Sequence, residues 1–302
     1  MISRLRAHTT GTKYEGHIIN TLLWMKNNGL ANNTIETTSH KLNQIGRHAD
    51  LMNPEEAKTY IANLDVCNGT KAKMIDIYEY FAKTHNITWQ RPKYRYERKI
   101  PLIPTTENIN KVISASSKKY ATIFTILAET GIEGRELTTT NRNDIDIDQG
   151  IINVQGCKGH NSRSIKLTPK TADMLRAYLQ TYTTETPFPD SIIMGEQWRT
   201  IRNRLAQKLN EPQLKAIPLR NLRHHYATML YDKTKDIILV MQRLGHKKIN
   251  TTMFYTQLVT YNEQEEYTSK TATTVKEAQE LINAGFTKAD EIDGIHIYRK
   301  RK

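Results

Sequence analysis

The chain has 302 residues, and its 44 lysines and arginines against 31 aspartates and glutamates give a formal net charge of +13. This length predicts about two domains, and a composition of 38% hydrophobic and 25% charged residues is typical of folded globular proteins. No uncharged apolar run reaches the roughly 18 residues of a membrane span, and the first residues lack the apolar stretch of a secretory signal. These features exclude collagens, coiled coils, secreted mini-proteins and membrane proteins.

The two cysteines, Cys67 and Cys157, provide neither a disulfide framework nor the paired spacing of a zinc site. We therefore expect a protein of a reducing, cytoplasmic compartment. The surplus of positive charge predicts a negatively charged binding partner, and nucleic acid is the commonest one. A generally basic protein without such a partner is the alternative that charge alone leaves open.

The first 90 residues predict a small domain of four short helices. The segment from about 13 to 28 places apolar residues on one face and closes at Gly29, and Asn33 is the expected cap of the second helix. Asn53 is followed by a proline at the first helical position, and a fourth helix begins near Gly69.

Residues 91–104 predict an extended basic linker that is bounded by prolines and suited to lie along a phosphate backbone. A solvated connector with no DNA contact is the alternative. The candidate DNA-binding residues of this linker are Arg91, Lys93, Arg95, Arg98 and Lys99.

Helices and one small antiparallel sheet are expected in residues 105–262. Alternating apolar residues between 145 and 154 predict a hairpin, and 164–167 supplies a third strand. The fold class is therefore mainly α with a small sheet, in which a four-helix domain precedes an α+β domain of catalytic size. In the tail, residues 263–302, a capping box precedes a helix that closes at Gly285, and Asp293-Gly294 predicts a short β-hairpin.

Several enzyme motifs are absent from the sequence, namely a Gly-rich phosphate loop, His-Glu-x-x-His and paired cysteines. What remains is a cluster of arginine, histidine and tyrosine residues late in the second domain. Such groups suit phosphodiester chemistry without a metal or ATP. The cluster spans Leu222-Arg-His-His-Tyr-Ala-Thr228, Arg243-Leu-Gly-His246 and Thr251-Thr-Met-Phe-Tyr255.

A tyrosine is a demanding nucleophile, because a phenol with a pKa of about 10 is ionised only about once in a thousand molecules at neutral pH. Its attack on phosphorus therefore needs roughly 4 kcal/mol of help from a base or a positive field. Arginine forks match the oxygens of the pentavalent phosphoryl group, and a hairpin lysine can protonate the leaving 5′ oxygen. A covalent tyrosine link keeps the bond energy for rejoining, so we expect no cofactor and no metal.

The block ending at Thr228, the Leu-Gly-His246 and the tyrosine nine positions later resemble the tyrosine recombinases of the phage-integrase and Xer type. Thr130-Gly-Ile-Glu-Gly-Arg-Glu-Leu137 is similar to the first box of that family, and Gly156-Cys-Lys-Gly159 is similar to its lysine hairpin. The resemblance covers residues 105–260 in detail. It implies that residues 1–90 are a DNA-clamping core-binding domain, and the tail is similar to the ends of archaeal members.

The resemblance implies a role for each matching residue. Tyr255 aligns with the nucleophile, Arg223 with the second catalytic arginine and His246 with a contact to the scissile phosphate. Lys158 aligns with the general acid, and Glu136 matches an acidic position that braces the site. Two nearby basic residues, Arg163 and Lys166, compete for the role of general acid.

Two positions depart from the family pattern. Glu133 stands where the first catalytic arginine is expected, and Arg135 is two positions away, a rotation of about 200° along a helix that only an irregular turn would offset. Arg220 stands where a histidine or lysine is usual, and an arginine binds phosphate but is no general base. His224 and His225 are close in sequence, and packing is the better expectation for His225.

The resemblance implies a site-specific DNA recombinase, an integrase in preference to a chromosome-dimer resolvase, that works through a 3′-phosphotyrosine intermediate. Its partners would be double-stranded attachment sites and other copies of the chain in a tetramer on DNA, at the nucleoid of a prokaryote or on the DNA of its virus. The tail would pack on its own subunit or a neighbour's. Glu133 and Arg220 motivate an alternative, a DNA-binding protein on the same fold with lost or weak catalysis. A relaxing topoisomerase explains the tyrosine but not the helical clamp and the linker.

Overall fold

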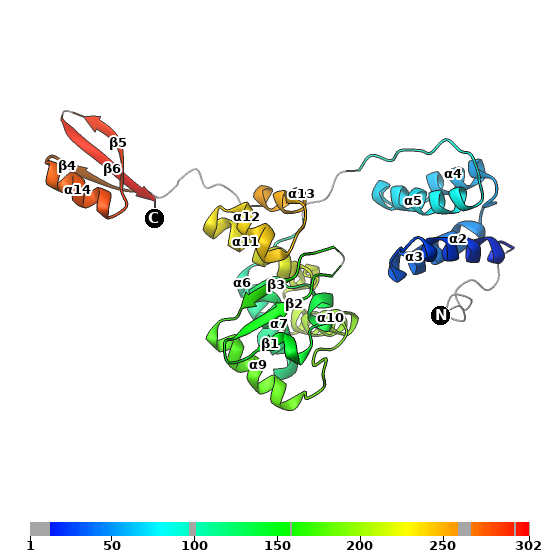
Figure 1. The fold of residues 1–302 in the computed structure, drawn as a ribbon, viewed down its shortest axis with the longest axis horizontal. Coiled ribbons are helices and arrows are strands. Elements are labelled where there is room, and N and C mark those ends of the chain that lie inside the picture. Colours follow the sequence, from blue (N-terminus) through cyan, green and yellow to red (C-terminus); the bar gives the residue numbers. More distant parts are fainter. Residues whose placement is uncertain (1–12, 97–100, 158, 259–266, 293, 302) are drawn as a thin grey trace. The chain divides into compact units, whose positions relative to one another are not determined.

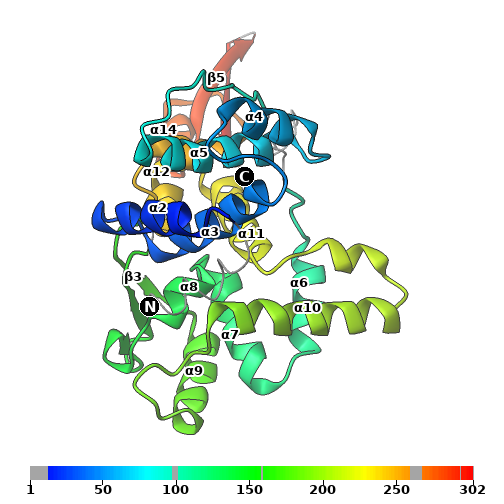
Figure 2. The ribbon, with the colours of Figure 1, turned by 90° about the vertical axis from the view of Figure 1, so that its right-hand side faces the viewer.

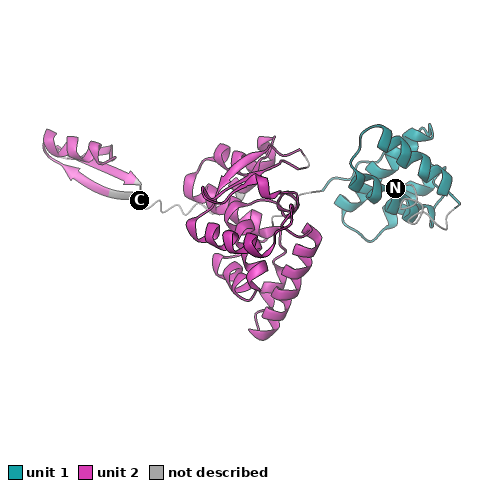
Figure 3. Ribbon diagram, turned by 60° about the horizontal axis from the view of Figure 1, so that its bottom comes forward, with its two compact units in different colours: residues 1–99 teal, residues 100–302 magenta. Residues whose placement is uncertain are grey.

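The computed structural model describes residues 13–96, 101–157, 159–258, 267–292 and 294–301, and the chain divides into two compact units, residues 1–99 and 100–302 (Figure 3). Helices dominate both units, and two small antiparallel sheets lie in the second. In the ranges described, no helix is long and apolar enough to cross a membrane.

The first unit consists of helices around one apolar core (Figure 1). The Asn53 side chain accepts a hydrogen bond from the backbone N–H of Glu55 at 3.1 Å, which confirms the predicted cap. The prediction for Asn33 is wrong, because the second helix already begins at Asn32 and Ala31 occupies its cap position. The helices are α2 (Glu15–Asn27), α3 (Asn32–Gly46), α4 (Pro54–Asn63) and α5 (Asn68–Thr84).

The second unit begins with three helices and a sheet of order β1-β2-β3, in which every pairing is antiparallel. Ile152 faces Ile165 across the sheet, and both side chains are buried, as the apolar alternation predicts. The elements are α6 (Thr106–Ser114), α7 (Lys118–Thr130), α8 (Gly134–Thr138), η1 (Arg142–Asp144), β1 (Ile145–Asp146), β2 (Ile151–Val154) and β3 (Arg163–Lys166).

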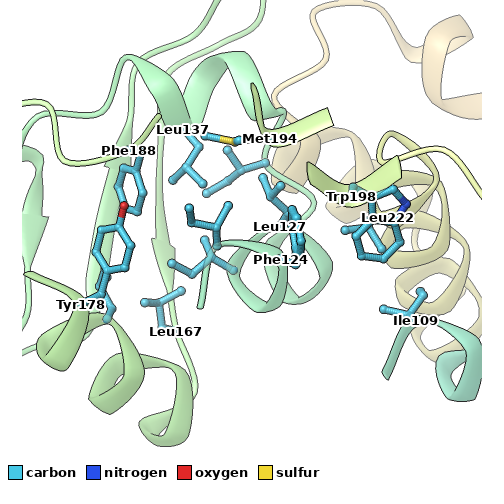
Figure 4. Close-up of a cluster of buried hydrophobic side chains, with 14 of the residues drawn as sticks. Ile109, Phe124, Leu127, Leu137, Leu167, Tyr178, Phe188, Met194, Trp198 and Leu222 are labelled. Atoms are coloured by element: carbon cyan, nitrogen blue, oxygen red, sulfur yellow. The ribbon is translucent and has the colours of Figure 1, made fainter. Parts of the chain in front are cut away.

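Between this sheet and the tail, the second unit is helical, and its 18-residue helix α10 lies beside α6 (Figure 2). Trp198 of α10 packs edge-on against Phe124 of α7, with 5.0 Å between ring centroids, and Leu222 joins the same buried cluster (Figure 4). Since Leu222 stands at the start of α11, this packing fixes α11 against α7. The elements are α9 (Pro169–Thr181), α10 (Ser191–Lys208), η2 (Pro212–Ala216), α11 (Asn221–Thr234), α12 (Ile237–Leu244), α13 (Ile249–Met253) and η3 (Phe254–Gln257).

The tail contains more structure than the expected helix and hairpin. Its strands β4 (Tyr267–Ala272), β5 (Thr287–Ile292) and β6 (Ile295–Arg301) form a sheet of order β4-β6-β5, next to α14 (Val275–Asn283). The Thr274 capping box is present, and Gly294 has a φ of +76°, whereas Asp293 lies outside the described residues. The sequence did not predict β4, because its mostly polar residues show no apolar alternation.

Candidate active site

Four stretches that are far apart in the sequence meet in the second unit: the turn from α7 into α8, the β2–β3 hairpin, the first turn of α11, and the end of α12 with the residues that follow it. Hydrogen bonds join each stretch to at least one of the others. The helical element η3 then packs on α11. This is the region into which the sequence motifs map.

The carboxylate of Glu136 lies at the centre of this cluster and is fully buried. Its oxygens accept two hydrogen bonds from the Arg163 guanidinium, at 3.0 and 2.8 Å, one from His160 Nδ1 at 3.0 Å and one from the backbone N–H of Glu133 at 3.0 Å. Burial raises the pKa of this carboxyl, but the Arg163 bonds, the Glu133 N–H and His160 outweigh burial and lower the pKa to about 2. Glu136 is therefore ionised at neutral pH.

The Arg223 guanidinium is buried where two helices end. Its Nη1 donates to the backbone oxygen of Gly131 at 2.6 Å, next to the end of α7, and its Nη2 donates to the oxygen of Leu244 at 2.8 Å, at the end of α12. The carbonyls at a helix C-terminus carry partial negative charge, so they stabilise a cation there. Burial lowers the pKa of Arg223, and Glu133 and Glu136 oppose that effect. An arginine stays protonated in such a site.

His246 is held in one tautomer by its neighbours. Its Nε2 lies 3.1 Å from Arg223 Nη2, which has only protons to donate, so Nε2 accepts and carries no proton. The proton is then on Nδ1, which donates to Thr252 Oγ1 at 2.9 Å. Burial, followed by the Arg223 charge, lowers the pKa of His246 to about 4. This histidine is neutral at physiological pH.

Tyr255 lies in η3 and is almost fully buried, at 4% exposure. Its ring packs in a small apolar cluster that includes Ala227, Val240 and Leu244. Its hydroxyl is 3.1 Å from Nδ1 of His224, the residue that follows Arg223 on α11. The candidate nucleophile is thus hydrogen-bonded to the helix that carries Arg223.

Glu133 brings a second carboxylate to the site, at the position where the family pattern has an arginine. Its Oε1 lies 3.9 Å from Arg223 Nε and 4.0 Å from His160 Nε2. About a third of the Glu133 side chain is exposed. Sequence reasoning noted the departure at this position but not the ion pair that it makes, and it missed His160, because no spacing in the sequence links the hairpin to α8.

Arg163, named from sequence as a competitor of Lys158, has its guanidinium bound to the Glu136 carboxylate and to the Arg243 backbone oxygen, at 2.7 Å from Nε. Lys166 is exposed and donates to the backbone oxygen of Gln149. His225 packs as expected: its Nδ1 is 2.9 Å from the Pro104 oxygen, and burial lowers its pKa.

Three other candidates are not part of the cluster as described. Arg135 on α8 and Arg220 at the start of α11 are both exposed. Neither side chain has a hydrogen bond or ion pair with the cluster among the residues that the structure describes. Lys158 lies outside the described residues, although its neighbours in the hairpin approach α8. The roles of these three residues stay predictions.

The described parts of the basic linker, residues 91–96 and 101–104, have no helix or strand. Residues 91–96 contact helix α5: the Asn68 side chain donates to the backbone oxygen of Arg95 at 3.0 Å, and the Arg91 guanidinium pairs with Asp76. The side chains of Arg91, Lys93 and Arg95 are exposed. Arg98 and Lys99 lie outside the described residues.

Comparison with known proteins bears on this site. The sequence profile of the phage integrase family matches residues 103–261, more than half of the chain. The chain belongs to the phage integrase family. It is similar to the tyrosine recombinase XerA of Saccharolobus solfataricus, at 30% identity over 62% of this chain and 62% of the relative, and to XerA of Thermococcus kodakarensis, at 28% identity over 53% and 60%. The chain thus spans about 60% of the length of these curated relatives.

Solved structures of the phage integrase family share the fold. A lambda integrase dimer bound to a COC′ core site has a TM-score of 0.62 at 13% identity, over 84% of this chain and 79% of that chain. The Tn1549 transposon integrase in complex with a circular intermediate DNA has a TM-score of 0.59 at 14% identity, over 89% and 99%. These likenesses confirm the predicted fold class.

Replacing Glu136 by glutamine should destabilise this phage integrase family member in a pH-dependent way. At pH 7 the change leaves buried Arg163 unpaired, and breaking such a pair costs about 3–5 kcal/mol. Since the folded-state pKa of Glu136 is about 2 against a usual 4.5, its stabilisation is fully present above pH 4.5 and is lost as the pH falls toward 2. Urea unfolding at pH 7 and pH 3 measures the difference.

The matched control is Glu107→Gln, because the Glu107 carboxylate pairs with Lys111 but is 75% exposed. We expect it to lower the unfolding free energy by about 1 kcal/mol or less at pH 7. An equal loss for Glu136→Gln at both pH values would contradict the assigned charge state.

Proposed function

We propose that this chain is a site-specific DNA recombinase of the integrase type, which cuts and rejoins duplex DNA through a 3′-phosphotyrosine at Tyr255. Membership of the phage integrase family supports the proposal. The observation that carries it is the hydrogen bond between the Tyr255 hydroxyl and His224, the residue that follows Arg223 on α11, while Arg223 Nη2 lies 3.1 Å from His246 Nε2. A preorganised guanidinium stabilises the charge that develops when a tyrosine attacks a phosphodiester.

Arg223 is the proposed phosphate-binding group. The bonds to Gly131 O, Leu244 O and His246 Nε2 occupy three of its five N–H donors, which leaves Nε–H and one Nη1–H for the non-bridging oxygens of the phosphate. Because helix-end carbonyls hold the guanidinium in place, little reorganisation is needed when charge develops on the phosphoryl group. Losing one such donor typically slows a reaction about a hundred- to a thousand-fold.

The remaining roles follow the family alignment. Lys158 is the proposed general acid that protonates the leaving 5′ oxygen. His246 would contact the scissile phosphate once its proton moves from Nδ1 to Nε2, because Nε2 now accepts from Arg223. Exposed Arg220 is available to bind the phosphate backbone. Glu136 positions the site through Arg163 and His160. All of this chemistry uses protein groups and needs no metal, no ATP and no other cofactor.

The partners that we propose are duplex DNA attachment sites and further copies of the chain. Cutting and rejoining four strands needs four active sites, so a homotetramer assembled on DNA is implied. Residues 1–90 would clamp the duplex and the 91–104 linker would follow its backbone, in keeping with a net charge of +13. The archaeal relatives support action on the DNA of a prokaryotic cell or its viruses, in the cytoplasm.

Replacing Tyr255 by phenylalanine should abolish covalent attachment to DNA, because it removes the nucleophilic oxygen. A duplex selected from a randomised pool by non-covalent binding, and then nicked, is incubated with protein and run on a denaturing gel. We expect a protein–DNA adduct with the unaltered chain, insensitive to EDTA, and none with Tyr255→Phe.

The control is Tyr231→Phe, which removes a hydroxyl from another tyrosine of the apolar cluster that contains Tyr255. This variant should still form the adduct. If the unaltered chain forms no adduct while it binds DNA tightly and in a salt-sensitive way, the function is that of a DNA-binding protein without catalysis. The position of Glu133 next to Arg223 is the feature that would explain such an outcome.

The basic linker should contribute to the salt dependence of DNA binding. Each phosphate contact adds about 0.9 to the slope of log affinity against log salt, so the double variant Lys93→Ala/Arg95→Ala should lower that slope by about 1.8. Fluorescence anisotropy across a salt series measures it. The double variant Lys58→Ala/Lys71→Ala changes the charge equally within the first unit, but Lys58 pairs with Glu55 and Lys71 donates to the Ala62 oxygen. We expect a change below 1 there, and equal changes for both pairs would contradict a linker contact.

Arg135 is the proposed replacement for the missing first arginine. Because Arg135 is exposed, Arg135→Ala should leave the melting temperature unchanged while it slows adduct formation about a hundred-fold or more. Arg176→Ala, an exposed arginine on α9 that pairs with Asp173, is the matched control and should change the rate less than twofold. An unchanged rate for Arg135→Ala would assign the phosphate contact to another residue.

A further inference from the structure

The hydroxyl of Tyr255 is hydrogen-bonded to a histidine for which the family alignment gives no role. His224 Nδ1 lies 3.1 Å from this hydroxyl, and the two ring centroids are 5.8 Å apart. His224 projects from α11 one residue after Arg223, so the same helix turn that presents the phosphate-binding guanidinium also presents an imidazole to the tyrosine. The imidazole is half-buried, so small solutes have access to it.

Among the residues that the structure describes, the other candidate bases of this site are unsuitable. Arg220 is exposed and permanently protonated. His246 already accepts a hydrogen bond from Arg223 through its unprotonated nitrogen, and burial lowers its pKa to about 4. His160 donates a hydrogen bond from Nδ1 to the Glu136 carboxylate, and its Nε2 lies 4.0 Å from Glu133 Oε1. His224 is thus the imidazole that contacts the attacking oxygen itself.

The direction of the hydrogen bond follows from the chemistry of the two groups. A phenol O–H is a stronger donor than a neutral imidazole N–H, and an unprotonated imidazole nitrogen is a stronger acceptor than a phenol oxygen. The favoured arrangement has the Tyr255 hydroxyl donating to His224 Nδ1. Transfer of the hydroxyl proton along this hydrogen bond to His224 Nδ1 is then sufficient to generate a phenolate.

We infer that His224 is the general base of this site, which takes the Tyr255 proton during strand cleavage and returns it during rejoining. This inference rests on the proposed function and deepens it. In cleavage, the phenol proton moves to His224 Nδ1, the phenolate oxygen forms a bond to phosphorus, and the bond from phosphorus to the 5′ oxygen breaks while the general acid protonates that oxygen. Rejoining reverses each transfer, so the imidazolium reprotonates Tyr255 and no proton is gained or lost over the cycle.

Two substitutions separate proton transfer from packing. His224→Asn keeps an oxygen or nitrogen near the place of Nδ1, so it keeps a hydrogen bond to Tyr255 but takes no proton. His224→Ala removes both and leaves a space open to solvent. Positioned general bases contribute about a hundred- to ten-thousand-fold. We expect both variants to form the adduct at least about a hundred-fold more slowly, with DNA affinity within about twofold of the unaltered chain.

The decisive measurement is rescue of His224→Ala by added small molecules in a single-turnover adduct assay on the selected duplex. Imidazole should raise the rate of adduct formation by His224→Ala at least tenfold, in proportion to the imidazole concentration. Pyrazole has the same size and shape but is a far weaker base, so it should restore nothing. The unaltered chain, already supplied with its base, should respond to neither.

The outcomes separate this inference from the proposed function. If the unaltered chain forms an adduct and His224→Asn forms it at the same rate, or if pyrazole rescues as well as imidazole, His224 only fills space and the inference is wrong. If the unaltered chain forms no adduct, the proposed function fails first. Should His224→Ala not fold, as its melting curve would show, the rate of His224→Asn decides alone.

Discussion

Two guanidinium groups, those of Arg163 and Arg223, are buried near each other in this protein, and the carboxylate of Glu136 contacts both, at 2.8 and 3.8 Å. Burying either cation without a partner would be strongly unfavourable. The two arginines do not serve the same purpose, however. Arg163 directs its guanidinium at Glu136 and at the Arg243 carbonyl, so it stabilises the site. Arg223 keeps Nε–H and one Nη1–H free of a close hydrogen bond to these partners, and these donors are what a phosphate would meet.

The backbone supplies the rest of that arrangement. Helices α7 and α12 both close on a left-handed glycine, Gly131 with a φ of +65° and Gly245 with a φ of +73°. A side chain at Gly131 would place its Cβ 2.4 Å from a Tyr226 ring carbon, and one at Gly245 would come within 2.7 Å of Arg163 Nη1. The two glycines therefore terminate their helices and also leave room for the groups that pack there. The carbonyls so exposed are the ones that orient Arg223.

Local signals in the sequence were sufficient for most elements of this fold. The Asn53 cap of α4, the hairpin alternation of β2 and β3 and the capping box of α14 each depend on a few neighbouring residues. Glu136 was identified from its position in a motif, and the structure shows its physical role. The contacts of His160 with α8 and of His224 with Tyr255 join segments 24 and 31 residues apart, and no local pattern encodes them. Strand β4 was missed for a related reason, because only Ala272 shows an apolar, buried side chain among its described positions.

Glu133 poses the sharpest electrostatic problem for a site that binds phosphate. A phosphate bonded to Arg223 Nε would share this group with the Glu133 carboxylate, whose Oε1 lies 3.9 Å from Nε. Two like charges at about 4 Å repel by about 4 kcal/mol at an effective dielectric of 20, which exceeds the gain from a typical charge-assisted hydrogen bond of about 1.5–3 kcal/mol. A phosphate within about 4 Å of this carboxylate would therefore require the Glu133 side chain to turn away, and its one-third exposure provides a path to solvent. Glu136 has no such freedom, because four hydrogen bonds hold it. Of the two carboxylates, Glu136 is fixed to the arginines that shape the site, whereas Glu133 pairs with Arg223 at the longer distance of 3.9 Å and would have to give up that pair to a phosphate.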